Sequence, residues 1–232
     1  MGKSVMDGMI YVNGDSYSTL VPDFPIWTDT LSEISGRSIV NHSIPGSSND
    51  SIFRCTLEYA TNNQVETVIL ATSFITREEV WEDTLEFSHT IRQHEQEIGC
   101  KFITSEFVEQ KYGIHRYNKF NDLHKQLCDY YFNVYLLTRH LTSIGINYFV
   151  FSAAPTVLGG GEWDNDILLY ISNLQYYKIL LDDPRFLDVT DFSLVEWSIE
   201  TNQNRTKTNH LLQDGHENFA NHMYDTYLKE LI

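Results

Sequence analysis

Basic residues are scarce in this chain. Its 232 residues include 16 Lys and Arg against 32 Asp and Glu, which gives a formal net charge of −16 at pH 7. A surface with that charge repels the phosphates of nucleic acids and the headgroups of anionic lipids. We therefore expect no nucleic acid and no membrane surface among the partners, and we interpret most of the acidity as an ordinary solvated surface.

Cysteine is also rare, and long apolar runs are missing. Cys55, Cys100 and Cys128 are far apart and form no CxxC pair, so we expect reduced thiols and neither a disulfide framework nor a zinc site. The first residues, MGKSVMDGM, lack the apolar segment of a signal peptide, and the other apolar runs are short. The sequence therefore predicts a soluble, cytoplasmic protein without membrane insertion.

Motifs for cofactors are absent as well. The chain contains no Walker or dinucleotide-binding pattern and no zinc-ligand spacing. We therefore expect no metal and no organic cofactor. The sequence makes no prediction of the oligomeric state.

Short apolar runs rich in β-branched and aromatic residues alternate with helical patterns. Runs that are apolar on both faces are typical of buried parallel strands, and they occur at residues 8–13, 38–41, 66–72, 146–152 and 185–189. Apolar residues spaced three or four apart predict helices at 49–61, 119–144 and 217–231. This alternation predicts one α/β domain over residues 1–232, a three-layer α/β/α sandwich around a mostly parallel five-stranded sheet.

The stretch YVNGDSYST places Ser16 just after the first predicted strand. In parallel sheets, ligands bind beyond the carboxyl ends of the strands, so Ser16 is expected at the ligand edge. Gly, Asp and Ser are also common turn and cap residues at such a junction, and this simpler interpretation stays open for the motif taken alone.

A second polar group occurs near the other end of the chain. Asp214 and His216 stand two residues apart, just before the last predicted helix. A serine hydroxyl becomes a nucleophile when an imidazole takes its proton, and a carboxylate can orient that imidazole. We interpret Ser16 as nucleophile, His216 as base and Asp214 as its orienting acid. His89, His94, His115, His210 and His222 lack a carboxylate at a useful spacing, and we interpret them as surface or packing residues.

On these residues the chain resembles the SGNH hydrolases, also called GDSL esterases and lipases. Their first block, a strand ending in Gly-Asp-Ser, is matched by Gly14-Asp15-Ser16, and their last block by Asp214-Gly215-His216. The glycine of their second block corresponds to Gly46 in SIVNHSIPGSSND. The resemblance implies an SGNH or flavodoxin-like fold, with the backbone amides of Ser16 and Gly46 binding the oxyanion.

The third block of that family is not matched. The family has Gly-x-Asn-Asp after the third strand, and the asparagine donates to the oxyanion, whereas this chain has Ala71 and Ser73 at those positions. Two side chains are candidates for the missing donor, the hydroxyl of Ser73 and the amide of Asn49. The loss of one donor typically costs about a hundredfold to a thousandfold in rate.

Three further residues are candidates for substrate binding. Arg77 can bind an anionic group, and Tyr17 and Trp163 can form an aromatic platform; a salt-bridged helix start and ordinary packing are the alternatives. The resulting hypothesis is a serine esterase that acts on a small-molecule or glycan ester, with acetyl on a carbohydrate as the favoured acyl group. A non-catalytic SGNH-like module that binds a glycan or a protein is the alternative, and acyl transfer is not separated from hydrolysis.

Overall fold

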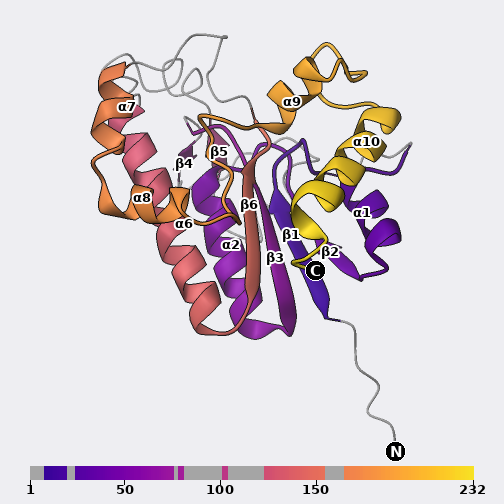
Figure 1. Cartoon of the computed structure of the whole chain (residues 1–232), viewed down its shortest axis with the longest axis horizontal. Coiled ribbons are helices and arrows are strands. Elements are labelled where there is room, and N and C mark those ends of the chain that lie inside the picture. The colour runs from indigo at the N-terminus through magenta and orange to yellow at the C-terminus, as the bar shows by residue number, and fades with distance from the viewer. Residues whose placement is uncertain (1–7, 20–23, 76–77, 81–100, 104–122, 155–164) are drawn as a thin grey trace, which may run out of the picture.

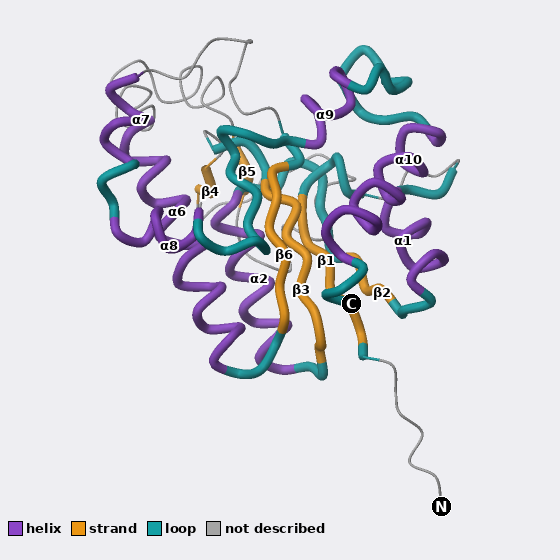
Figure 2. Tube along the Cα trace, viewed as in Figure 1, coloured by secondary structure: helices purple, strands orange, loops and turns teal. Residues whose placement is uncertain are grey.

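The central sheet is parallel and has four strands in the order β2-β1-β3-β6 (Figures 1 and 2). The structure is a computed structural model, which describes residues 8–19, 24–75, 78–80, 101–103, 123–154 and 165–232. The strands of the central sheet are β1 (Met9–Gly14), β2 (Ile39–Asn41), β3 (Val65–Thr72) and β6 (Asn147–Ser152). A separate antiparallel pair consists of β4 (Glu78–Val80) and β5 (Lys101–Ile103).

Helices cover both faces of the sheet, as Figure 1 shows. One layer contains α2 (Asn49–Asn62), α6 (Leu123–Ser143), α7 (Asn165–Ile171) and α8 (Gln175–Leu181). The other contains α1 (Trp27–Ser35), α9 (Leu194–Glu200), α10 (Gln213–Met223) and a π-helical turn, η1 (Tyr224–Leu228). The predicted three-layer α/β/α sandwich is confirmed. None of the helices in the described part of the chain is long and apolar enough to cross a membrane.

The alternation of side chains along the strands explains the two layers. Successive residues of a strand point to opposite faces of the sheet. Tyr11 and Val68 pack with the helices of the α2 layer, whereas Ile10, Val12 and Ile69 pack with those of the α1 layer. All five are fully buried. Because helices cover both faces of the sheet, the central residues of β1, β3 and β6 are mostly apolar, which is why the sequence pattern identified these strands.

The predicted fifth strand is only partly formed. At residues 185–189 the chain runs beside β6, and Phe186 forms one parallel bridge with Val150. Two backbone hydrogen bonds hold this bridge, from Val150 N to Arg185 O at 2.8 Å and from Leu187 N to Val150 O at 2.9 Å. A turn at Asp188 then interrupts the pairing, and Ser193 forms a second isolated parallel bridge with Ser152 of β6. The five-stranded sheet was therefore wrong in strand number, although the segment lies where a fifth strand would.

The register of the sheet brings three strand ends together. Gly14 at the end of β1 pairs with Ala71 of β3, and Ala71 pairs with Phe151 of β6. Side chains that follow β1 and β3 therefore meet at one edge, and this edge carries Ser16 and Ser73.

The buried carboxylate of Asp188 holds the region next to β6. It accepts hydrogen bonds from the hydroxyls of Tyr131, Tyr177 and Thr190, each at 2.7 Å. Burial and the adjacent carboxylate raise the pKa of Tyr131, so this phenol stays protonated and donates. Asp188 therefore connects α6 and α8 to the end of the partial strand.

We predict that Asp188→Ala destabilises the fold by about 3 kcal/mol, because two buried phenols would lose their acceptor at a cost of about 1–3 kcal/mol each. Urea denaturation followed by circular dichroism measures this loss. Asp191→Ala is the matched control, since Asp191 is exposed and its replacement should change the free energy of unfolding by less than about 0.5 kcal/mol. Equal effects of the two changes would show that the Asp188 network contributes nothing specific.

Candidate active site

A tight turn after β1 presents Ser16. Asp15, which is fully buried, accepts the Tyr17 N–H at its Oδ1 (3.1 Å), and its carbonyl accepts the Ser18 N–H (3.0 Å). Asp15 thus accepts hydrogen bonds from two backbone N–H groups of the turn, those of Tyr17 and Ser18. Ser16 is half-buried at the edge of the sheet. The aspartate of the Gly-Asp-Ser motif therefore fixes the turn that carries the serine.

Gly14 is required by close packing rather than by an unusual backbone angle. A Cβ atom at this position would lie 2.8 Å from the carbonyl oxygen of Ala71, on the neighbouring strand. Real side chains do not tolerate that approach to a backbone atom, so only glycine fits at the end of β1.

The end of β3 is joined to the same turn. Ser73 donates its hydroxyl proton to Asp15 Oδ2 at 2.7 Å. The Asn49 side chain, at the start of α2, accepts the Ser73 N–H at 2.7 Å and donates to the Ser73 carbonyl at 3.1 Å. Ser73 and Asn49 are both buried. These two candidate oxyanion donors therefore lie at the site, where both are engaged with protein partners.

The loop that carries Gly46 lies along the same edge. Ile44 N donates to the Gly14 carbonyl at 3.1 Å, which attaches the loop to the end of β1. Gly46 has a φ of +87°, a left-handed conformation that glycine adopts at little cost. Within the described residues, the backbone N–H groups of Ser16 and Gly46 have no protein acceptor. Two free N–H donors are thus available near the serine.

The histidine that contacts Ser16 is His210. Its Nε2 lies 2.9 Å from Ser16 Oγ, which is hydrogen-bonding distance for a base and a nucleophile. The ring of Tyr17 stacks on the His210 imidazole, with centroids 4.6 Å apart and an interplanar angle of 14°. The serine and its neighbour on the chain therefore hold the imidazole from two sides.

The loop before α10 brings His210 to this position. Thr206 N donates to the His210 carbonyl at 2.8 Å, and Leu212 N donates to the Asn204 carbonyl at 3.0 Å. Asn209 has a φ of 62°, a left-handed conformation that asparagine tolerates better than most residues. The loop is thus closed by its own hydrogen bonds, and its turn directs His210 toward the sheet.

A threonine occupies the other side of the imidazole. His210 Nδ1 lies 3.0 Å from Thr208 Oγ1, and Thr208 Oγ1 lies 3.0 Å from Thr206 Oγ1. In the described part of the chain no carboxylate pairs with His210. The arrangement is therefore serine, histidine and a neutral hydroxyl, in place of serine, histidine and an acid.

Comparison with known proteins identifies the fold that carries this site. No family model and no curated protein matches the sequence. Among solved structures, the psychrotrophic esterase EstA from Pseudoalteromonas sp., inhibited by monoethylphosphonate, is 12% identical, with a TM-score of 0.55 over 97% of this chain and 99% of its own. The acetylxylan esterase Axe2 from Geobacillus stearothermophilus, solved as a catalytic mutant, is 10% identical, with a TM-score of 0.54 over 94% and 93%. A protein designated a GDSL-like lipase from Parabacteroides merdae is 12% identical, with a TM-score of 0.50 over 94% of each chain.

The chain has the SGNH hydrolase fold. The expectation drawn from the Gly-Asp-Ser motif is therefore confirmed at the level of the fold. Identities this low carry no information on individual residues, so the site has to be interpreted from its own contacts.

His216 does not contact Ser16 in this structure. We expected His216 before the last helix, but α10 begins earlier, at Gln213, so that His216 lies within it. It shares a face with Phe219, Ala220 and Met223, spaced three, four and seven residues away, and all are buried. Its Nδ1 accepts the Trp27 N–H at the start of α1 at 3.3 Å. His216 thus packs between α10 and α1.

Asp214 does not orient either histidine. It is exposed in the first turn of α10, where Oδ2 accepts from Asn204 Nδ2 at 2.5 Å and Oδ1 accepts the Gly215 N–H at 3.0 Å. Residues two apart on a helix point to different sides, so Asp214 and His216 cannot face each other. The predicted acid and base are therefore separated by the helix that contains them.

The remaining predictions concern substrate binding. Tyr17 lies at the site but is only 6% exposed, because its ring packs on His210 and near Phe74. It therefore supports the imidazole and is not an open platform. Arg77 and Trp163 lie outside the described residues.

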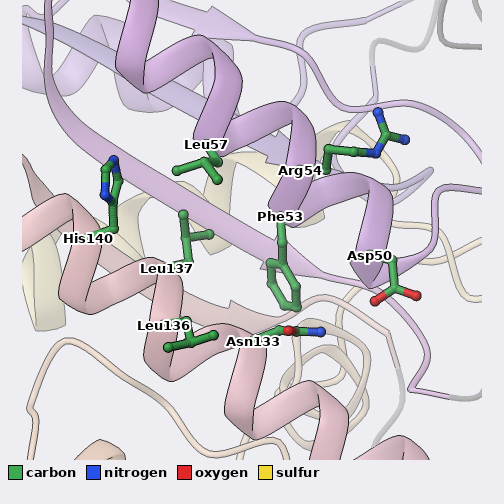
Figure 3. A pocket seen from close by; sticks show the side chains of 8 residues that line it. All are labelled: Asp50, Phe53, Arg54, Leu57, Asn133, Leu136, Leu137 and His140. Atoms are coloured by element: carbon green, nitrogen blue, oxygen red, sulfur yellow. The ribbon is translucent and has the colours of Figure 1, made fainter.

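A separate hollow of about 450 Å³ lies between α2 and α6 (Figure 3). Phe53 and Leu57 from α2 and Leu136 and Leu137 from α6 form its apolar walls. None of its lining residues belongs to the Ser16 site, so we do not assign it to substrate binding there.

Burial controls the charge of His216. The side chain is only 3% exposed, and burial, together with the nearby His210, lowers its pKa from 6.5 to about 4. His216 is therefore neutral in the folded protein at neutral pH and accepts the Trp27 N–H.

We predict a specific loss of stability in acid. Between pH 6.5 and about 4 the unfolded chain binds a proton at His216 that the folded chain does not, so protonation favours unfolding over this window. Between pH 7 and pH 4.5, His216 should account for a loss of about 2 kcal/mol. Urea denaturation at pH 7 and pH 4.5 measures it, and His216→Gln keeps an acceptor that does not titrate. If both proteins lose the same stability on acidification, the assignment to His216 is wrong.

Proposed function

We propose that this protein hydrolyses carboxylic esters through an acyl-enzyme on Ser16. The observation that carries the proposal is the 2.9 Å contact between Ser16 Oγ and His210 Nε2 at the carboxyl edge of an SGNH-type sheet. A serine becomes nucleophilic when a base within hydrogen-bonding distance can take its proton. His210 takes the role that the sequence pattern gave to His216.

The reaction has two halves. As Ser16 Oγ attacks the ester carbonyl carbon, its proton passes to His210 Nε2, and the imidazolium then gives that proton to the leaving alcohol. Water attacks the acyl-enzyme in the second half, with His210 again accepting and returning a proton. The acyl group leaves as a carboxylic acid, and Ser16 is regenerated. If an acceptor hydroxyl replaces water, the same residues perform acyl transfer.

The backbone amides of Ser16 and Gly46 form the oxyanion hole in this proposal. Both N–H groups lack a protein acceptor in the described part of the chain, and both lie at the edge that carries the nucleophile. The side chains of Ser73 and Asn49 are committed elsewhere. The single Ser73 hydroxyl proton points to Asp15, and the Asn49 amide donates to the carbonyls of Ser73 and Phe74 at 3.1 and 3.5 Å.

A small acyl group on a carbohydrate is the proposed substrate. The SGNH-fold neighbours include an acetylxylan esterase, which supports this class, as does an acidic surface that would repel anionic lipid. The alternative is a non-catalytic module that binds a glycan or a protein on the same scaffold. The contact between Ser16 and His210 favours catalysis, because binding alone does not require a base on the serine hydroxyl.

We predict that a fluorophosphonate probe modifies Ser16 and that Ser16→Ala abolishes the adduct, as detected by intact-mass and peptide mass spectrometry. His210→Gln should lower turnover of p-nitrophenyl acetate by at least about a thousandfold, as expected for loss of the general base. The physical reason is that Ser16 has no other base within hydrogen-bonding distance in the described part of the chain.

His216→Gln is the matched control for that experiment. It removes the other histidine near the site and keeps an acceptor for the Trp27 N–H, so turnover should stay within about threefold of the parent. If His216→Gln is inactive and folded while His210→Gln is active, His216 is the base. Folded parent protein that shows neither adduct nor turnover would favour the binding module.

We also predict small effects from the two candidate side-chain donors. Asn49→Ala and Ser73→Ala should each lower kcat by less than about tenfold, because loss of a true oxyanion donor costs about a hundredfold to a thousandfold. Steady-state kinetics on the same ester measures the effect. A loss of a hundredfold or more in Asn49→Ala, with its melting temperature preserved, would make the Asn49 amide the missing donor.

A further inference from the structure

The hydroxyl of Thr208 stands where a carboxylate would orient the catalytic imidazole. On the proposed function, His210 must present an unprotonated Nε2 to Ser16, so its proton has to lie on Nδ1. Nδ1 faces Thr208 Oγ1 at 3.0 Å. A carboxylate accepts only and fixes this tautomer, whereas a hydroxyl can both donate and accept.

The hydrogen bonds of Thr206 determine whether the Thr208 hydroxyl can donate or accept toward His210. Thr206 Oγ1 accepts the backbone N–H groups of Thr208 and His210, both at 3.2 Å, which uses its two lone pairs. In its 3.0 Å contact with Thr208 it must therefore act as donor. Thr208 Oγ1 then keeps one lone pair and one proton, and either of them can face His210 Nδ1.

Two proton arrangements follow from this count. In the first, Nδ1–H donates to Thr208, the Thr208 proton goes to solvent, and Ser16 donates to Nε2. In the second, Thr208 donates to Nδ1, and Nε2–H donates to Ser16, which leaves the serine without a base. Thr208 is exposed, so water is available for the first arrangement. Only the first arrangement is active.

We propose that Thr208 is the positioning residue of His210, and that its hydroxyl holds the ring in place while leaving both imidazole tautomers populated. A carboxylate at position 208 would select the active tautomer and speed the reaction. In the native chain, His210 is thus correctly placed, but only a fraction of the molecules has the active tautomer, with the proton on Nδ1.

Among the residues that the structure describes, no carboxylate contacts His210 directly. Tyr17 stacks on the ring from the turn after β1, and His216 approaches from α10, where burial keeps it neutral. Lys207 precedes Thr208 and is exposed, and Asp214 is bonded to Asn204 and Gly215. An acidic residue at position 208 would therefore be the first carboxylate to pair with the imidazole among the described residues.

The test uses four variants of the full chain: Thr208→Val, Thr208→Ser, Thr208→Asn and Thr208→Asp. Nitrogen-15 NMR of the imidazole nitrogens reports the tautomer without substrate, and p-nitrophenyl acetate turnover is measured from pH 5 to pH 9. The parent and Thr208→Ser should show shifts between those of the two pure tautomers and equal rates. Thr208→Val removes the hydroxyl that contacts both His210 Nδ1 and Thr206 Oγ1, and it should lower kcat about three- to tenfold with KM unchanged.

Thr208→Asp should shift the imidazole to the Nδ1–H form and raise kcat at pH 8 at least about tenfold. Its negative charge also favours the imidazolium, so the acid limb of the rate profile should move up by about one pH unit. Thr208→Asn has the same shape without the charge, and it should produce neither change. Parent shifts of a single pure tautomer, or a Thr208→Val variant identical to the parent in shifts and rate, would overturn the proposal.

The two proposals fail separately. If no variant turns over any ester while the NMR shifts change as expected, the hydrolase is wrong and the positioning role of Thr208 stands. If the parent is an active esterase and the shifts of all four variants equal those of the parent, the esterase stands and the role of Thr208 is wrong.

Discussion

The buried carboxylate of Asp15 is the interaction on which the site depends. A carboxylate that is fully buried must have its oxygens satisfied, and here one oxygen accepts the Tyr17 amide while the other accepts the Ser73 hydroxyl. These two bonds join the end of β1 to the end of β3. These bonds restrict the movement of the turn that presents Ser16. In the proposed reaction, a rigidly held Ser16 would let a base on a loop be effective.

The proposed base, His210, is held by weaker contacts. His210 lies on a loop closed by hydroxyl and backbone hydrogen bonds, several of them to Thr206 Oγ1. Bonds between neutral groups contribute about 1 kcal/mol each, less than a charge-assisted bond, and exposed ones compete with water. The Tyr17 ring, which stacks on the imidazole, compensates for these weak bonds, because the stacking limits rotation of the His210 ring. The proposed nucleophile is thus held by a buried carboxylate, and the proposed base is held by neutral contacts.

Sequence patterns predicted the parts of this molecule that depend on local chemistry. Continuous apolar runs located the four strands, and Gly14, Asp15 and Ser16 located the turn. Gly14 is required because the neighbouring strand lies too close for a side chain, and Asp15 supplies the buried acceptor of the turn. The contact between His210 and Ser16 was not predicted, for a physical reason. A carboxylate beside a histidine is visible as a sequence motif, whereas a threonine hydroxyl is too common to signal anything. His216 was chosen because it follows Asp214, although its spacing to Phe219, Ala220 and Met223 already indicates a helix core.

His216, which lies away from Ser16, still affects the position of the His210 loop through its packing. The loop that carries His210 ends at Leu212, where α10 begins, and α10 packs directly against α1. His216 lies in that interface and accepts the first N–H of α1, which is a donor that a helix start leaves unpaired. Its neutral form therefore helps to fix how α10 meets α1, and through α10 it helps to fix where the loop ends. Because the same burial lowers the pKa of His216 to about 4, this interface keeps its hydrogen bond through the pH range in which an imidazole base can work.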